Sequence, residues 1–232
     1  MAAAGQADAA GNANAHSRRA LEELIQAYWF PLYAFVRRQG VCCQGAPTGA
    51  EDLVQEFFAR LLERKFLDQV DRSKGKFRSF LLAAMKHFLS KERDKFRAQK
   101  RGGNRSVIAL DALEAQARYA VEPVDDMTAE RLFERRWALA VLDQVLIRLS
   151  SDYAQSGKGR LYEAIEPCLA GGAGAIDYGQ ASRELKMTEG ALRVAVHRLR
   201  RRYRDLLRAE IAQTVDSPDQ IEDEITYLLN CL

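Results

Sequence analysis

The sequence predicts an all-α protein with two small helical domains joined by an acidic linker, followed by a short C-terminal helix. Apolar residues recur at spacings of three and four through most of the chain, which is the period of a helix with one buried face. No segment shows a convincing strand-like alternation. Loops containing Gly and Pro separate the helical segments, and the 47% hydrophobic content is enough to bury a core.

Residues 17–103 are predicted to form the first domain, after a flexible stretch, 1–16, that is rich in Ala, Gly and Asn. Its first helix carries apolar residues at helical spacing from Leu21 to Val36, and Pro31 is the position at which this helix can kink. The segment AEDLVQEFFARLLERKFL predicts a second helix, with a buried stripe of Leu53, Phe57, Leu61 and Leu62.

The third helix of this domain, FRSFLLAAMKHFLSKERDKFRAQKR, is apolar nearly all round in its first half and strongly basic in its second. Four phenylalanines accompany the basic residues, and such rings can stack on unpaired bases. Phenylalanines at helical spacing are more often core residues, so we favour the core for Phe77, Phe80 and Phe88.

Residues 104–127 are predicted to form the acidic linker, with Asp126 or Thr128 capping the helix that follows. The second domain, 128–209, begins with the long amphipathic segment AERLFERRWALAVLDQVLIRLSSDY. A shorter helix, GKGRLYEAIEPCL, and a glycine loop come next. Residues 210–232 are predicted to form an acidic extension that ends in a short helix.

The segment YGQASRELKMTEGALRVAVHRLRRRYRDLL, residues 178–207, predicts a helix-turn-helix. A short helix breaks at residues 186–188, and Thr188 can cap the longer helix that follows. That longer helix has an apolar stripe of Leu192, Val196, Leu199, Tyr203 and Leu206. Since the second helix of this motif enters the DNA major groove, its groove-facing set is predicted to be Thr188, Glu189, Gly190, Arg193, Val194 and His197. The arginines from 198 to 204 are predicted to bind phosphates.

Charge is sorted along the chain, although the formal net charge is only +3. Residues 74–105 carry eleven Lys and Arg against two acids, and residues 193–208 carry seven against one. Residues 209–232 carry six acids and no Lys or Arg. Two basic segments favour a nucleic-acid partner over a solvated basic surface, and the acidic tail could pack as a simple helix or fold back as an internal inhibitor.

Several other classes of protein are disfavoured. No apolar stretch is long enough to span a membrane, and the start of the chain lacks the order of a signal peptide, so a cytoplasmic protein is expected. The four cysteines do not have the spacing of a disulfide framework or a zinc site. With no phosphate-binding loop and three scattered histidines, neither an enzyme, a metal site nor a cofactor is predicted.

The order of these segments resembles the bacterial RNA polymerase sigma factors of the small, two-domain extracytoplasmic-function type. The resemblance covers residues 18–208 and is most specific at AEDLVQEFF. It implies that the protein binds the clamp and flap of core RNA polymerase, directs the enzyme to promoters and opens their minus-ten region. An anti-sigma factor is a possible further partner. The sequence departs from the family at Lys186, where glycine is usual.

The resemblance also implies roles for individual residues. Polymerase binding falls to Glu51, Asp52, Gln55 and Glu56. Minus-ten DNA contacts fall to Asp71, Arg72, Ser73, Lys74, Lys76, Lys86, Lys91, Arg93, Lys95, Arg97, Lys100 and Arg101, with the loop capturing a flipped base. The minus-thirty-five contacts are Thr188, Glu189, Gly190, Arg193, Val194, His197, Arg198 and Arg201. The alternative is a two-domain helix-turn-helix regulator that binds DNA without polymerase.

Overall fold

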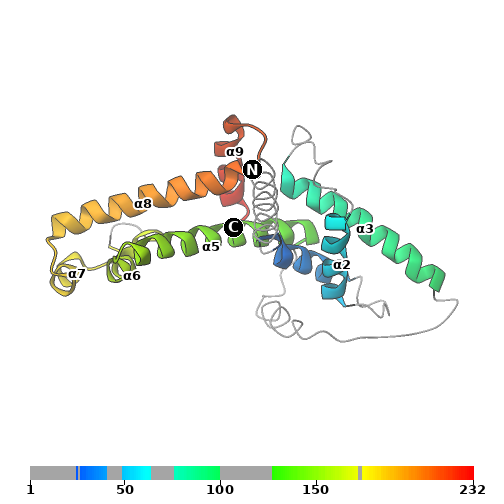
Figure 1. Cartoon of the computed structure of the whole chain (residues 1–232), viewed down its shortest axis with the longest axis horizontal. Coiled ribbons are helices and arrows are strands. Elements are labelled where there is room, and N and C mark those ends of the chain that lie inside the picture. The colour runs from blue at the N-terminus through cyan, green and yellow to red at the C-terminus, as the bar shows by residue number, and fades with distance from the viewer. Residues whose placement is uncertain (1–24, 26, 41–48, 64–75, 100–126, 172–173) are drawn as a thin grey trace, which may run out of the picture. The chain divides into compact units, whose positions relative to one another are not determined.

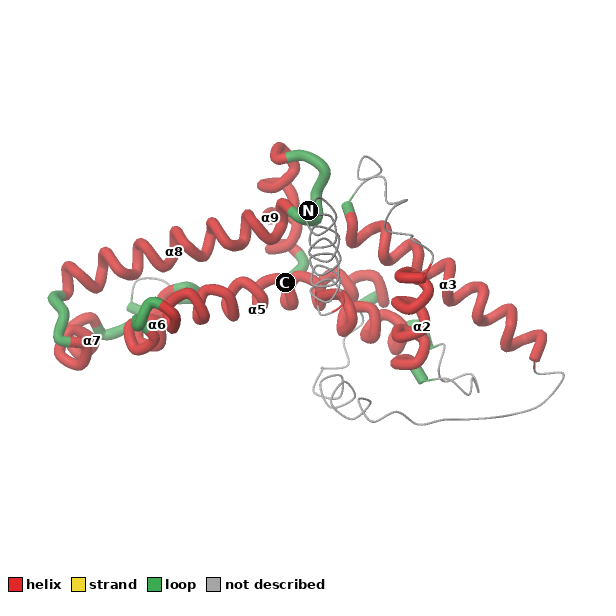
Figure 2. Tube along the Cα trace, viewed as in Figure 1, coloured by secondary structure: helices red, strands yellow, loops and turns green. Residues whose placement is uncertain are grey.

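The computed structural model describes residues 25, 27–40, 49–63, 76–99, 127–171 and 174–232. Every regular element in these residues is a helix, which confirms the predicted all-α class (Figures 1 and 2). No helix in the described part of the chain has an apolar stretch long enough to cross a bilayer. The predicted flexible N-terminus and nearly all of the predicted linker lie outside the described residues.

Tertiary contacts divide the chain into two compact units: unit 1 is Met1–Ala140 with Leu228–Leu232, and unit 2 is Val141–Tyr227. The division falls inside helix α5, Ala129–Gln155, whose first half belongs to unit 1. Helix α5 begins where the sequence predicts, because the Thr128 hydroxyl caps it by accepting a hydrogen bond from the Arg131 N–H at 3.3 Å.

Unit 1 contains the helical residues 27–38, helix α2 (Ala50–Glu63), helix α3 (Phe77–Gln99) and the start of α5. The first of these helices continues through Pro31 without a break. The rings of Phe57 and Phe88 meet edge to face at 5.8 Å and join α2 to α3. The largest fully buried side chains of the unit are Leu32, Phe35, Leu53, Leu81, Met85, Phe133 and Trp137.

Unit 2 contains the rest of α5, α6 (Gly159–Ile165), the 3₁₀ turn η4 (Glu166–Cys168), α7 (Tyr178–Leu185) and α8 (Glu189–Ala212). The turn η5 (Pro218–Gln220) and most of α9 (Ile221–Asn230) follow. Its core is formed by Leu149, Tyr162, Ile165, Cys168, Ala181, Leu192, Val196 and Leu199. Figure 1 shows α8 running beside the second half of α5.

Two ion pairs join α8 to α5. Arg148 contacts Glu210 at 2.7 Å, and Arg202 contacts Asp152 at 2.6 Å. Helix α9 confirms the predicted short C-terminal helix, and its Glu222 pairs with Arg208 of α8 at 2.7 Å. The acidic tail therefore neutralises one arginine at the C-terminal end of α8.

Candidate nucleic-acid interface

Capping residues fix where helix α7 begins and ends and where helix α8 begins. The Asp177 carboxylate accepts hydrogen bonds from Gly179 and Gln180 N–H groups at 2.8 and 3.0 Å, and starts α7. Lys186 then takes the left-handed conformation, with φ 53° and ψ 42°, and ends it. Thr188 caps α8 as predicted, because its hydroxyl accepts a hydrogen bond from the Ala191 N–H at 3.2 Å.

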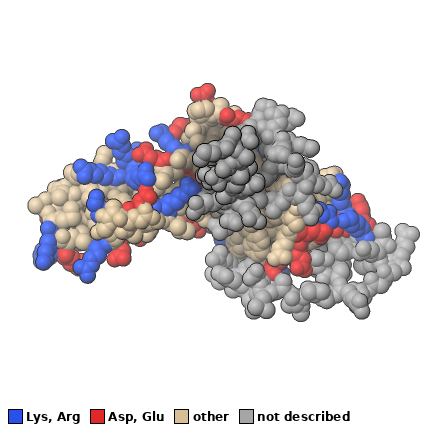
Figure 3. Space-filling view, viewed as in Figure 1, with Lys and Arg blue, Asp and Glu red and all other residues tan. Residues whose placement is uncertain are grey.

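Helix α8 presents one buried face and one open face. Leu192, Val196 and Leu199 are between 0% and 4% exposed, which confirms three positions of the predicted apolar stripe, whereas Tyr203 and Leu206 are half-buried. Leu207 and Ile211 continue this buried face toward the end of the helix. The opposite face, which we call the outer face of α8, is exposed at all eight residues predicted to meet DNA: Thr188, Glu189, Gly190, Arg193, Val194, His197, Arg198 and Arg201. Figure 3 shows basic side chains spread over the end of unit 2 where Figure 1 places α7 and the start of α8.

Arg193 is held in place by two neighbours. Its guanidinium lies 3.4 Å from the Glu189 carboxylate and 5.3 Å from the centre of the Tyr178 ring. A cation above an aromatic ring is attracted to it, and the ring also limits the rotamers that the side chain can adopt. Tyr178 was not among the predicted site residues, because it lies on α7 and shares no helical period with Arg193.

The arginines of α8 differ in whether they are free to bind a phosphate. Among the described residues, no carboxylate lies within ion-pair distance of Arg198 or Arg201. Arg202, by contrast, is paired with Asp152. Arg200 donates hydrogen bonds to the Cys168 carbonyl at 2.8 and 3.0 Å. The sequence pattern did not distinguish these residues, since the partners are 32 and 50 positions away.

Arg200 has a structural role that can be measured. It also donates to the Gly171 carbonyl at 3.3 Å, and so satisfies one backbone acceptor at the end of η4 and one after it. We expect Arg200→Ala to lower the free energy of unfolding by about 1.5 kcal/mol, because charged hydrogen bonds to a carbonyl are lost. Arg201→Ala removes an equal charge from the next residue and should leave the urea midpoint unchanged. Equal loss in both variants would refute the assignment.

The predicted polymerase-binding residues on α2 are not all exposed. Gln55 is exposed, and Asp52 is half-buried and accepts a hydrogen bond from the Gly49 N–H at 3.1 Å. Glu56 is half-buried and pairs with Arg60 one turn along the helix. Glu51, however, is only 8% exposed, which corrects the expectation that it lies away from the buried stripe.

The buried face of α2 is broader than its apolar spacing suggested, because Val54 and Phe58 are also buried at 0% and 4%. Glu51 lies three and seven positions before them, on the same face of the helix. The other residues of the predicted set keep some exposure to solvent.

In the second half of α3 the basic side chains that the structure describes, Lys91, Arg93 and Lys95, are exposed, as is Lys86 before them. Lys86 pairs with Glu130 of α5 at 2.9 Å, and the hydrogen bond from Lys86 lowers the pKa of the Glu130 carboxyl. Arg93 contacts Gln39 at 3.4 Å, while Lys91 has no carboxylate within ion-pair distance among the described residues. Lys76 is half-buried at the start of the helix. The side chain of Arg97, and residues Asp71, Arg72, Ser73, Lys74, Lys100 and Arg101, lie outside the described residues.

A buried carboxylate joins α2 to α3. Glu92 is 6% exposed and contacts Arg60 at 2.9 Å and Lys95 at 2.7 Å. Burial lowers the pKa of Arg60, but the charges of Glu56 and Glu92 outweigh it and raise this pKa above its ordinary value. The network therefore holds Lys95 against the protein. Lys95 is thus less free than Lys91 to bind DNA.

Of the phenylalanines weighed between core and base stacking, Phe88 is buried and Phe77 and Phe80 are half-buried. Phe77 meets the ring of Tyr28 edge to face at 5.6 Å. The contacts favour the packing role that the sequence suggested for these residues.

Within the described residues, no group of His, Cys, Asp and Glu side chains is arranged to hold a metal ion. No protein-family model matches the sequence, and no match to the chain was found among curated proteins or solved structures.

Proposed function

We propose that this protein is a sigma factor that binds core RNA polymerase, brings it to specific promoters and opens their minus-ten region. The observation that carries the proposal is the outer face of α8. A helix is anchored by Leu192, Val196 and Leu199 and held by a capped turn after a short helix, while its opposite face exposes arginines and a histidine. This arrangement suits a helix-turn-helix that enters the major groove.

The exposed residues along α8 would make two kinds of DNA contact, to bases and to phosphates. Arg193, near the N-terminal end, is oriented by Glu189 and Tyr178 and can donate two hydrogen bonds to a guanine edge. Arg198 and Arg201 lie further along and would contact phosphates, which position the helix without reading sequence. Arg200 and Arg202 would contribute little to DNA binding, since their guanidinium groups already donate to the Cys168 carbonyl and the Asp152 carboxylate.

The first unit supports the same proposal through α2 and α3. The exposed basic side chains of α3, among them Lys91 and Arg93, can follow the backbone of a separated DNA strand, and Lys86 could join them if it left its pair with Glu130. Opening a duplex costs a few kcal/mol for each unstacked base, so phosphate contacts of this kind must offset it. The half-exposed polar residues of α2 are the proposed polymerase contact.

In vitro transcription tests the proposal directly. Core RNA polymerase is mixed with the full chain on a fragmented bacterial genome library, and transcript start sites are sequenced. A sigma factor should give starts at a shared pair of promoter elements that are absent without the chain. Duplex binding without polymerase, with the DNA left closed and no transcripts, would instead support the helix-turn-helix regulator.

The salt dependence of DNA binding should separate the free arginines from the occupied ones. Arg201→Ala is expected to reduce the magnitude of the slope of log affinity against log salt by about 0.9, because one phosphate contact is lost and fewer counterions are released. Arg202→Ala removes the same charge from the adjacent residue but breaks the pair with Asp152, so its slope should change less.

Affinities of both variants and the wild type are measured between low and physiological salt on one promoter fragment, with polymerase present. Slopes that are unchanged by Arg201→Ala would mean that the outer face of α8 does not contact phosphates.

A further inference from the structure

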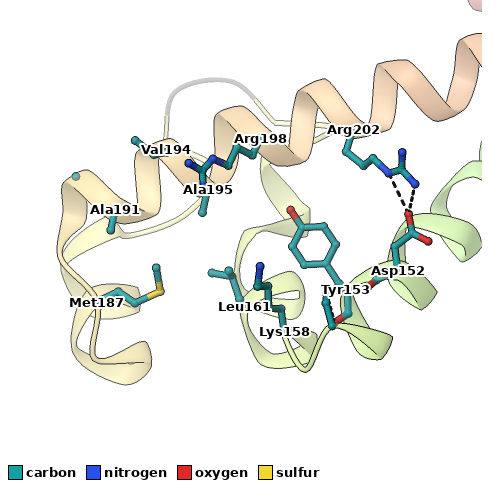
Figure 4. Close-up of a pocket in the computed structure, with 12 residues that line it drawn as sticks. Asp152, Tyr153, Lys158, Leu161, Met187, Ala191, Val194, Ala195, Arg198 and Arg202 are labelled. Atoms are coloured by element: carbon teal, nitrogen blue, oxygen red, sulfur yellow. Dashed lines mark hydrogen bonds and ion pairs between the residues drawn. The ribbon is translucent and has the colours of Figure 1, made fainter.

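A cavity of about 570 Å³ opens beside the outer face of α8 in unit 2 (Figure 4). Helix α5 contributes Asp152 and Tyr153, and the start of α6 contributes Lys158 and Leu161. Met187 comes from the turn before α8, and Ala191, Ala195, Arg198 and Arg202 come from α8 itself. The volume lies in the range of cavities that hold small organic molecules.

The floor of the cavity is apolar. Leu161 and Met187 are partly buried against the core of unit 2, and Ala191 and Ala195 have side chains too short to fill the space above them. Val194, at the rim, is 50% exposed. A planar ring lying on this floor would remove apolar surface from water, which is favourable in proportion to the area covered.

The charges around the cavity leave an excess of two positive side chains. The only acid in the lining, Asp152, accepts both hydrogen bonds that Arg202 donates, at 2.6 and 3.0 Å. Within the part of the chain that the structure describes, no carboxylate lies within ion-pair distance of Lys158 or Arg198. Figure 4 shows Lys158, just before α6, pointing toward α8, and Arg198 lying along α8 near Ala195.

The phenol of Tyr153 lies beside the same space. Burial raises its pKa, and the positive charge of Arg198 acts in the opposite direction, so the two groups are within electrostatic reach of each other. Among the described residues no hydrogen-bond partner of the Tyr153 hydroxyl is seen, and at neutral pH this hydroxyl can donate to a ligand.

We infer that this cavity binds a planar aromatic anion of about mononucleotide size. The ring lies on the floor of Leu161 and Met187, and the anionic group lies between Lys158 and Arg198, where both cations can donate charge-assisted hydrogen bonds. This site goes beyond the proposed function and does not depend on it. Since Val194 and Arg198 also belong to the outer face of α8, a bound anion would cover part of the surface predicted to meet DNA.

Calorimetric titration of the full chain tests the inference with four probes. Adenosine 5′-monophosphate and naphthalene-1-carboxylate each carry a ring and an anionic group, whereas adenosine and inorganic phosphate each carry one part. At least one of the two aromatic anions should bind, with adenosine and phosphate at least about 10-fold weaker. Binding of the nucleotide alone identifies a nucleotide site, and binding of the carboxylate alone identifies an aromatic acid site.

Variants locate the site. Lys158→Ala and Arg198→Ala should each weaken binding of the aromatic anion by about 10-fold, as expected for a lost charge-assisted hydrogen bond. Arg201→Ala is the matched control, because it removes the same charge from the same helix outside the cavity. Ala191→Leu should weaken binding without any change of charge, because it fills part of the floor.

Circular dichroism and thermal unfolding check that each variant is folded. The inference is overturned if neither aromatic anion binds, or if phosphate alone binds as tightly as the nucleotide. It is equally overturned if Arg201→Ala weakens binding as much as Arg198→Ala, or if Ala191→Leu leaves the affinity unchanged.

Discussion

Trp137→Ala is expected to lower the free energy of unfolding by about 3–5 kcal/mol, the cost typical of removing a large buried aromatic side chain. Trp137 is 0% exposed in unit 1, and its indole N–H donates to the Tyr28 hydroxyl at 3.2 Å. The Arg78 guanidinium lies 5.1 Å from the centre of its ring. The variant therefore leaves a cavity and also deprives a buried cation of the ring that helps to compensate its burial.

Urea unfolding followed by circular dichroism measures this loss. Trp137→Phe keeps most of the apolar volume and the ring face, but it removes the hydrogen bond to Tyr28, so its cost should be well below that of the alanine variant. A loss under about 1 kcal/mol for Trp137→Ala would contradict the packing of α5 described above, because the cost of such a cavity is rarely that small.

Removing one negative charge from α2 and adding one positive charge is expected to weaken capture of core RNA polymerase by about 100-fold or more, if α2 is the polymerase contact. Asp52→Asn combined with Gln55→Arg suits this test. Asn keeps an oxygen that can accept the hydrogen bond from Gly49, so the start of the helix is preserved. Glu56 is left intact because its pair with Arg60 belongs to the network around Glu92. If these polar residues meet basic residues of the polymerase, the new arginine brings like charges together across the interface, which costs several kcal/mol.

Polymerase capture is measured by pull-down and by surface-based titration of immobilised core enzyme. Ser90→Arg serves as the control for the introduced arginine, since it adds one positive charge, half of the change in the double variant, at an exposed position of α3 outside the predicted contacts. Capture should survive in this control. Undiminished capture by the α2 double variant, with an unchanged unfolding midpoint, would remove α2 from the proposed interface.

Local sequence patterns correctly predicted the features that depend on interactions between residues close in the sequence. The caps at Thr128 and Thr188, the apolar stripe of α8 and the short helix near the C-terminus were all predicted from spacing and residue type, and the structure contains them. These features depend on neighbours within one or two helical turns, so the sequence alone contains the relevant information.

Features that depend on distant partners were missed. Arg78 and Glu92 are buried although charged residues usually stay exposed, because Glu134 and Arg60 compensate them from 56 and 32 positions away. Glu51 is buried because the buried face of α2 also includes Val54 and Phe58, which the predicted stripe did not contain. The break at residues 186–188 was predicted, but residue type does not predict that a lysine there adopts the left-handed conformation that glycine usually fills.

Because helix α5 belongs to both units, it limits the positions at which the chain can be truncated. A fragment that begins at Thr128, after the predicted linker, would retain the whole helix and Leu228–Leu232 but lose the rest of unit 1. Phe133 and Trp137, each 0% exposed in the intact chain, would then face water along with Ala138. Such a fragment is expected to self-associate, because it would expose an apolar patch that unit 1 buries in the intact chain. An isolated second unit for crystallography or titration should instead start close to Val141, with the first residues replaced by polar helix formers.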